Sequence, residues 1–515
     1  MTPGGAVLVL VLLVLPSSDA QDQSQRRRSL SVSDGTRLIE AGRVAEARAA
    51  IDAALKRDPE SAHAHYLLGL ISERDRDFDA AVAAYQHAIR KAPGFALAHD
   101  RLGFALGQLA RTEAALEHFA EAVRLDPALF DAQYHLGATL WWTRRLDEAR
   151  PPLEAAVRLR PDHAEARYYL GLVLRQQGQL AEAVEHLRKA VALNPRLAPA
   201  HAQLGIALQQ WGDTLGAVEA LRTAAALDRS SADVRNSLGL ALMQAGEADA
   251  AIDTFRDLVR EFPDNLTARL NLGTSLIQKA DLEAAAGVLR ELLARDPGNA
   301  LARYNLGMAL KQQDNFVEAE VELRRAFELD PALHDASFTL GVVLWQTGRA
   351  AEAEAAFREA IAKRPDFPDA HYMLGTVLRQ RDATDEAIGA FRRTIELQPT
   401  SAEAYLSLGQ ALQRKGQTGA AAAALEQARA LNQRKADAQA STFAVSVGNR
   451  LLQGGDVAGA IKQYREAIRL ADDNPRAHYQ LAVALARSGA REEARRAFEQ
   501  ARRLAPYLQP PPGLQ

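Results

Sequence analysis

The chain of 515 residues contains no cysteine. This absence excludes disulfide bonds, a thiol nucleophile, a zinc–thiolate site, c-type haem attachment and a lipoprotein lipid anchor. Aromatic residues make up only 6% of the chain and β-branched residues are sparse, whereas Ala, Leu, Glu, Arg and Gln dominate, which is the composition of helices. The formal net charge is −3, so the chain lacks the basic excess of a protein that binds nucleic acid.

Common catalytic and metal-binding patterns are also missing. The sequence has no HExxH motif, no Walker A loop and no dinucleotide fingerprint. His63 and His65 are two residues apart, which is the wrong spacing for two metal ligands on one face of a helix. We therefore expect no enzyme activity, no cofactor and no metal site.

A continuous apolar run occupies residues 6–15, near the N-terminus. It is followed by Pro16 and by small residues at Ser18 and Ala20, which suit cleavage before Gln21. The run is shorter than the roughly 20 residues that a membrane span needs. We therefore expect a cleaved secretory signal at residues 1–20, a polar leader at 21–27, no membrane span after cleavage, and a secreted or periplasmic protein. An uncleaved anchor is the alternative, because no Lys or Arg precedes the run.

Small residues and prolines recur at a fixed distance along almost the whole chain. Between residues 126 and 195, Gly137 is followed by Ala149 and Pro161, and all three recur 34 residues later. With the first residue of a repeat counted as place 1, repeats begin at residues 28, 62, 96, 130, 164, 198, 232, 266, 300, 334, 368 and 402 and, after a five-residue offset, at 441 and 475. Place 8 is Gly in all of these fourteen repeats except the last, which has Ala482, and place 20 is always Ala. Two antiparallel helices that cross closely require such small side chains.

The pattern is similar to that of the tetratricopeptide repeat family over residues 28–508. The resemblance implies an all-α fold, in which about fourteen helix–turn–helix repeats form a right-handed superhelical solenoid. It also implies that the first helix of each repeat lines a concave groove, where family members typically hold peptides or other proteins.

A longer period is nested in the first. Residues 126–145 resemble residues 330–349, which lie 204 residues further along the chain. We interpret this likeness as the duplication of a six-repeat block, with one copy at residues 28–231 and a second at 232–435. The alternative is that all such repeats look alike.

The offset at residues 436–440 lies in a stretch that lacks Gly and Pro. It predicts a helix that continues across the offset and a candidate hinge. Two further repeats are expected at residues 441–508, followed by a proline-rich tail at 509–515 that is not helical.

Helical phase predicts that places 2, 5, 9 and 12 of each repeat face the groove. Place 5 is often aromatic, and place 12 holds a tryptophan in two equivalent repeats, each followed one repeat later by an arginine at the same place. Aromatic side chains and arginines dominate peptide-binding hot spots. The candidate partner-binding residues are therefore Tyr134, Trp141, Tyr168, Arg175, Tyr304, Phe338, Trp345, Tyr372 and Arg379. The alternative for each is packing between helices.

Place 4 is His or Arg in many repeats, which is similar to the repeat arm of the O-linked N-acetylglucosamine transferases. That family also carries Asn at place 6, where only Asn271 and Asn305 match, and no glycosyltransferase domain follows the repeats here. The resemblance therefore implies a shared style of repeat rather than a shared activity.

Together these features predict a protein-interaction scaffold that binds partner proteins or peptides in its concave groove. Two similar groove sites would allow avidity for a repetitive partner. The alternative is a periplasmic envelope assembly factor for pili, secretion or polysaccharide export, which would bind glycan or outer-membrane components.

Overall fold

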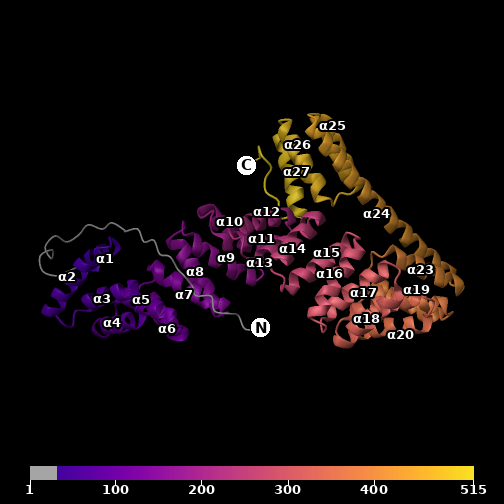
Figure 1. Cartoon of the computed structure of the whole chain (residues 1–515). Coiled ribbons are helices and arrows are strands. Elements are labelled where there is room, and N and C mark those ends of the chain that lie inside the picture. The colour runs from indigo at the N-terminus through magenta and orange to yellow at the C-terminus, as the bar shows by residue number, and fades with distance from the viewer. Residues whose placement is uncertain (1–31, 515) are drawn as a thin grey trace. The chain divides into compact units, whose positions relative to one another are not determined.

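The structure, a computed structural model, describes residues 32–514, with side chains from residue 35. The predicted signal at residues 1–20 and the leader at 21–27 lie outside the described residues. Within residues 32–514 the chain forms 27 α-helices and no strand (Figure 1), which confirms the predicted all-α repeat solenoid. None of these helices is both long and apolar enough to span a bilayer.

The helices belong to two compact units, one that ends at Gln210 and one that begins at Trp211. The boundary falls inside the eleventh helix and does not coincide with the edge of the predicted six-repeat block at residue 231. The duplication of that block stays a prediction. The helices up to the boundary are α1 (Val32–Glu40), α2 (Val44–Arg57), α3 (Ala62–Arg74), α4 (Phe78–Lys91), α5 (Ala96–Gln108), α6 (Thr112–Leu125), α7 (Phe130–Trp142), α8 (Leu146–Leu159), α9 (Ala164–Gln176), α10 (Leu180–Leu193) and α11 (Ala198–Trp211).

The second unit continues the same alternation of first and second helices. Its helices are α12 (Thr214–Leu227), α13 (Ala232–Gln244), α14 (Ala248–Glu261), α15 (Leu266–Gln278), α16 (Leu282–Arg295), α17 (Ala300–Gln312), α18 (Phe316–Leu329), α19 (His334–Gln346), α20 (Ala350–Lys363), α21 (Pro368–Gln380), α22 (Thr384–Leu397), α23 (Ala402–Arg414), α24 (Thr418–Gln453), α25 (Val457–Leu470), α26 (Pro475–Arg487) and α27 (Arg491–Leu504).

Helix ends follow the places of the repeat. In several repeats a polar side chain just before the first helix caps it; Asn299 Oδ1 accepts a hydrogen bond from the backbone N–H of Ala302 at 2.9 Å. The turn between the two helices needs a left-handed residue at place 15, such as Gly348 with φ 81°. A proline two places beyond the second helix, such as Pro365 after α20, prevents that helix from continuing.

Each repeat is closed by the contact between its two helices. On α20, Ala353 (place 20 of its repeat) and Phe357 (place 24) have no exposed surface, and both belong to the core of the second unit. The glycine of the first helix, Gly341, lies directly against the Phe357 ring. The small residues therefore do what the sequence predicted, since they let a large side chain fill the space between the helices.

The two faces of each unit differ in how closely neighbouring repeats approach. In the described residues, first helices of successive repeats contact one another, as α19 and α21 do, whereas second helices of successive repeats do not. The first-helix face, by which we mean the side lined by first helices, is therefore the inner side of the solenoid. Side chains that leave the first helices on this side are available to a ligand.

Helix α24 crosses the predicted offset without a break and is 36 residues long (Figure 1). It serves as the second helix of one repeat and the first helix of the next, as the sequence predicted. None of residues 429–440 is buried, so this part of α24 belongs to neither of the hydrophobic cores at its two ends. The tail after Leu504 is not helical, as expected.

Candidate functional site

A hollow of about 490 Å³ opens on the first-helix face of the second unit. Three successive first helices, α19, α21 and α23, supply its walls. We call it the groove hollow, and its lining residues are Trp345, Thr376, Arg379, Gln380, Gln410 and Arg414. Two of them, Trp345 and Arg379, were predicted as partner-binding residues, and the structure brings them together.

Amide side chains hold both of these residues in place. The indole Nε1 of Trp345 donates a hydrogen bond to Gln380 Oε1 at 3.0 Å. Arg379 Nη1 donates to Gln410 Oε1, one repeat further on, at 2.6 Å. Each bond links neighbouring first helices, so the ring and the guanidinium are positioned by adjacent repeats rather than by their own helix.

The two arginines of the groove hollow differ in whether a carboxylate neutralises their charge. Arg414 Nη2 donates to Asp382 Oδ1 at 2.7 Å, so its charge is balanced. Arg379 forms no ion pair with any described residue, and its hydrogen-bond partner, Gln410, is neutral. The hollow therefore carries one positive charge that the protein itself does not neutralise.

The equivalent residues of the first unit, Trp141 and Arg175, adopt a related arrangement. Arg175 Nη1 approaches the neutral Gln210 Oε1 at 3.5 Å, and burial lowers the pKa of the guanidinium. Trp141 Nε1 and Gln176 Oε1 are buried, and neither has a hydrogen-bond partner among the described residues. Tyr169 packs edge-on against Trp141 with ring centroids 5.4 Å apart. The equivalent residue of the second unit is Met373.

Place 5 does not face an open groove in every repeat, which corrects the expectation from helical phase. Tyr134 is only 3% exposed and packs against His163, the last residue of its own repeat, with ring centroids 5.1 Å apart. Phe338 is covered in the same way by Phe367, at 4.9 Å. Phe338 does not line the groove hollow of its own unit, and Tyr134 is buried in the first unit.

The other place 5 candidates are partly buried. Burial raises the pKa of both Tyr168 and Tyr304. Tyr372 packs on Phe391 with centroids 5.8 Å apart, and its hydroxyl lies 3.4 Å from Ser407 Oγ. A role in partner binding stays a prediction for all three tyrosines.

The side chains at place 4, most of them basic, have a structural role that the sequence did not reveal. In nine repeats the place 4 side chain donates a hydrogen bond to a backbone carbonyl six residues earlier, in the turn from the preceding repeat. A histidine in this position must carry its proton on Nε2, because a carbonyl oxygen only accepts. The bonds run from His65 to Pro59, His99 to Pro93, Gln133 to Pro127, Arg167 to Pro161, His201 to Pro195, Arg269 to Pro263, Arg303 to Pro297, His371 to Pro365 and His478 to Asp472.

Family models of the tetratricopeptide repeat match most of the chain. The matched segments are residues 34–94, 96–129, 139–198, 203–265, 242–303, 276–340, 338–402, 390–423, 448–489 and 475–508. The chain belongs to the tetratricopeptide repeat family. None of the matching models describes a catalytic family.

No curated protein matches this tetratricopeptide repeat chain. Among solved structures, MamA from Desulfovibrio magneticus RS-1 is 28% identical over 33% of this chain and 96% of its own, with a TM-score of 0.31. A tetratricopeptide repeat protein from Parabacteroides merdae ATCC 43184 is 16% identical over 48% of this chain and 98% of its own, with a TM-score of 0.43. YrrB, described as a TPR protein with an unusual peptide-binding site, is 24% identical over 36% of this chain and 96% of its own, with a TM-score of 0.34.

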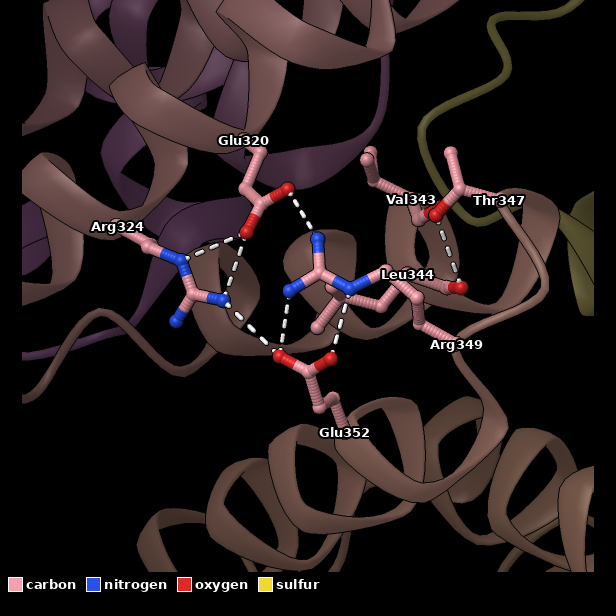
Figure 2. Close-up of polar contacts among 7 residues, drawn as sticks. All are labelled: Glu320, Arg324, Val343, Leu344, Thr347, Arg349 and Glu352. Carbon is pink, nitrogen blue, oxygen red and sulfur yellow. Dashed lines mark hydrogen bonds and ion pairs between the residues drawn. The ribbon is translucent and has the colours of Figure 1, made fainter.

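The second helices of this tetratricopeptide array are joined by charged side chains. Figure 2 shows Arg349, at the start of α20, between the carboxylates of Glu320 and Glu352. Arg349 Nη1 donates to Glu320 Oε2 at 2.6 Å, and Arg324 donates to the other oxygen of Glu320 at 2.7 Å. An arginine at place 25 also reaches a glutamate at place 19 of the next repeat in three successive pairs, Arg290–Glu318, Arg324–Glu352 and Arg358–Glu386. Charges on this face are therefore largely paired, unlike Arg379.

In residues 32–514 no group of three or more His, Asp or Glu side chains is arranged to hold a metal ion. The candidate site is thus an open hollow lined by polar residues and one aromatic ring, and it offers hydrogen-bond donors and acceptors beside apolar area.

Proposed function

We propose that the protein is a non-catalytic scaffold that binds a peptide segment of a partner protein on its first-helix face. The groove hollow is the contact site. The observation that carries the proposal is the meeting of Trp345 and Arg379 in a hollow formed by three successive first helices.

The chemistry of the groove hollow supports a peptide ligand. Trp and Arg are the residues most enriched at binding hot spots, where a ring supplies apolar area and a guanidinium supplies several donors. The glutamines beside them can pair with peptide groups, since a side-chain amide both donates and accepts. An open hollow across three repeats suits an extended chain better than a compact small molecule.

We also propose that the scaffold acts outside the cytoplasm. The apolar run at residues 6–15 and the small residues before Gln21 support export, and a chain without cysteine suits an oxidising compartment.

The first experiment is site-specific photo-crosslinking in the source cells. A photoreactive phenylalanine analogue replaces Thr376 in the full chain, and a second chain carries the analogue at the exposed Val317, on the second helix α18 and outside the groove hollow. We expect a protein to crosslink at Thr376 and not at Val317, and we expect the adduct to disappear when Trp345→Ala and Arg379→Ala are added.

Two results would contradict the proposal. A partner that crosslinks equally at both positions would place binding elsewhere. A glycan recovered at Thr376 in place of a protein would favour the envelope assembly alternative.

A further inference from the structure

We infer that the ligand of the first-helix face is acidic, and that each unit binds one side-chain carboxylate through an arginine, Arg379 in the second unit and Arg175 in the first. This inference rests on the proposed function and specifies its ligand. It is carried by the way in which these two arginines differ from most of the partly buried arginines of the first helices.

Four partly or fully buried arginines on first helices are paired with a carboxylate, whereas the partly buried Arg167 donates to the backbone carbonyl of Pro161. Arg235 lies 2.7 Å from Glu261, Arg269 lies 2.7 Å from Glu291, and Arg303 lies 2.7 Å from Glu322, while Arg101 lies 3.2 Å from Glu73. Such pairing is expected, because removing a charge from water is costly unless an opposite charge accompanies it.

Arg175 and Arg379 depart from this rule in the same way. Both are partly buried, both occupy place 12, and each donates to a neutral glutamine, Gln210 or Gln410. Neither forms an ion pair with a described residue. A guanidinium has five N–H donors, so one bond to an amide leaves most of its fork available to an incoming carboxylate.

The number of charges favours a carboxylate over a phosphate. In the second unit Arg414 is already neutralised by Asp382, which leaves only Arg379. In the first unit the residue equivalent to Arg414 is Gln210, which leaves only Arg175. A phosphate group carries about −1.5 to −2 charges at neutral pH, whereas an Asp or Glu side chain carries one, which matches one guanidinium.

The tryptophan one repeat earlier completes each site. Trp345 lines the hollow with Arg379, so an acidic residue that reaches the guanidinium lies beside an apolar ring that excludes water. Exclusion of water strengthens the ion pair. Trp141 occupies the same place relative to Arg175 in the first unit.

Selection from a library of random short peptides displayed on phage tests this inference. The full chain serves as bait, and three variants are compared with it: Arg379→Gln, Arg175→Gln and the double variant. We expect the selected peptides to be enriched in Asp and Glu. We expect synthetic versions with Gln in place of Glu to bind roughly tenfold more weakly or worse, as the loss of a charge-assisted hydrogen bond implies.

The variants locate the acidic residue. Each single variant should remove the preference for Glu over Gln at the site in its own unit and leave the other site intact, and the double variant should abolish the difference between the Glu and Gln versions. Arg379→Lys keeps the charge but not the fork, so it should restore only part of the affinity. Arg393→Gln, on the second-helix face, is the matched control and should change nothing.

The outcomes separate the two proposals. Peptides that bind at the groove hollow without acidic enrichment would overturn the carboxylate inference and leave the peptide scaffold standing. Acidic peptides that bind the double variant as well as the wild type would overturn the assignment to Arg175 and Arg379. Failure to select any peptide, with no adduct at Thr376, would overturn both.

Discussion

Glycine at place 8 is the residue on which each repeat depends most directly. A Cβ added to Gly341 would lie 2.7 Å from Cε1 of Phe357, a ring with no exposed surface. The same conflict recurs in other repeats with Tyr, Phe or Leu at place 24. Because the opposing atom belongs to a packed ring in the core, the ring or the helix would have to move.

We therefore expect Gly341→Ala to lower the free energy of unfolding of the second unit by about 1–3 kcal/mol, as overpacking does. The matched control is Gly389→Ala on α22, where an added Cβ meets nothing within 4 Å. That change should raise stability by up to about 1 kcal/mol, because Ala loses less conformational freedom than Gly in a helix. Urea unfolding followed by circular dichroism measures both. Equal effects would show that place 8 does not require glycine.

The turn between the two helices of a repeat makes a second demand on single residues. The residue at place 15 of each described repeat has a left-handed backbone conformation. Six of these residues are not glycine; they are Arg76, Ala110, Arg144, Ala280, Asp314 and Asp382. A side chain in this conformation crowds its own carbonyl.

Arg144→Gly should therefore stabilise the first unit by roughly 1 kcal/mol. The neighbouring change Arg145→Gly is the control. Arg145 has φ −85° and pairs with Glu148, so glycine there adds freedom to the unfolded chain and removes an interaction. Thermal unfolding should show a higher midpoint for the first variant and a lower one for the second. A lower midpoint for Arg144→Gly would show that its side chain contributes more than its backbone costs.

At the scale of helices, neighbouring repeats are joined differently on their two faces. First helices of neighbouring repeats contact one another directly, whereas their second helices are joined by charged side chains such as those around Arg349 (Figure 2). The hydrogen bonds from Arg349 lower the pKa of Glu352 from its ordinary value of 4.5. A carboxyl whose pKa is lowered by folding stabilises the fold above its unfolded pKa and loses that effect as the pH falls through the folded pKa.

Arg349→Gln should consequently lower the unfolding temperature at about pH 7. The difference from wild type should begin to shrink as the pH falls below about 4.5, and it should disappear once the pH is below the lowered pKa of Glu352 in the folded protein. Added salt should reduce the difference too, because these side chains are exposed. Arg393→Gln removes a pair within one helix, Arg393–Glu396, and serves as the comparison for a contact that joins no repeats. A difference that persists unchanged in acid would show that Arg349 acts by packing.

Most of the fold could be predicted from the repeat. The 34-residue period placed the first helices correctly, because place 1 is the first helical residue at Ala62, Ala300 and Ala402. It also predicted the uninterrupted α24, since no helix breaker occurs near the offset. These features depend on local residue types, which a sequence shows directly.

The candidate site could be predicted only in part. Trp345 and Arg379 meet as expected, because their places bring them to the same face of adjacent first helices. Tyr134 is buried, and helical phase could not predict this. Helical phase gives only the direction in which a side chain leaves the helix axis, and it does not show what lies in that direction. The signal was the aromatic or aliphatic residue at place 34, such as His163 or Phe367, which covers place 5 of its own repeat.

At the scale of the whole molecule, the second unit contains two hydrophobic cores that α24 links. One core ends at Ala424 and the other begins at Ala444, and none of residues 429–440 is buried. No buried side chain joins this part of the helix to either core. It can lose helical structure without exposing either core.

Ala436→Pro should therefore leave the main thermal unfolding transition unchanged, although it breaks the helix locally. Ala424→Pro, in the core, should lower stability by roughly 3 kcal/mol or more, as proline inside a packed helix does. Calorimetry measures the transitions, and small-angle X-ray scattering should show a broader range of dimensions for Ala436→Pro alone. Equal destabilisation by both changes would show that the two cores unfold as one.

The exposed part of α24 also has a geometric consequence. A helix turns by about 100° and rises by about 1.5 Å with each residue. The number of residues between Ala424 and Ala444 therefore sets the direction in which the last two repeats point. Gain or loss of a single codon within residues 429–440 would swing these repeats by more than a right angle without disturbing any buried side chain. Insertions and deletions in this part of α24 can therefore change the direction of the last two repeats during evolution, in steps of about 100° per residue. The same changes elsewhere in the array would disrupt the packing between stacked repeats.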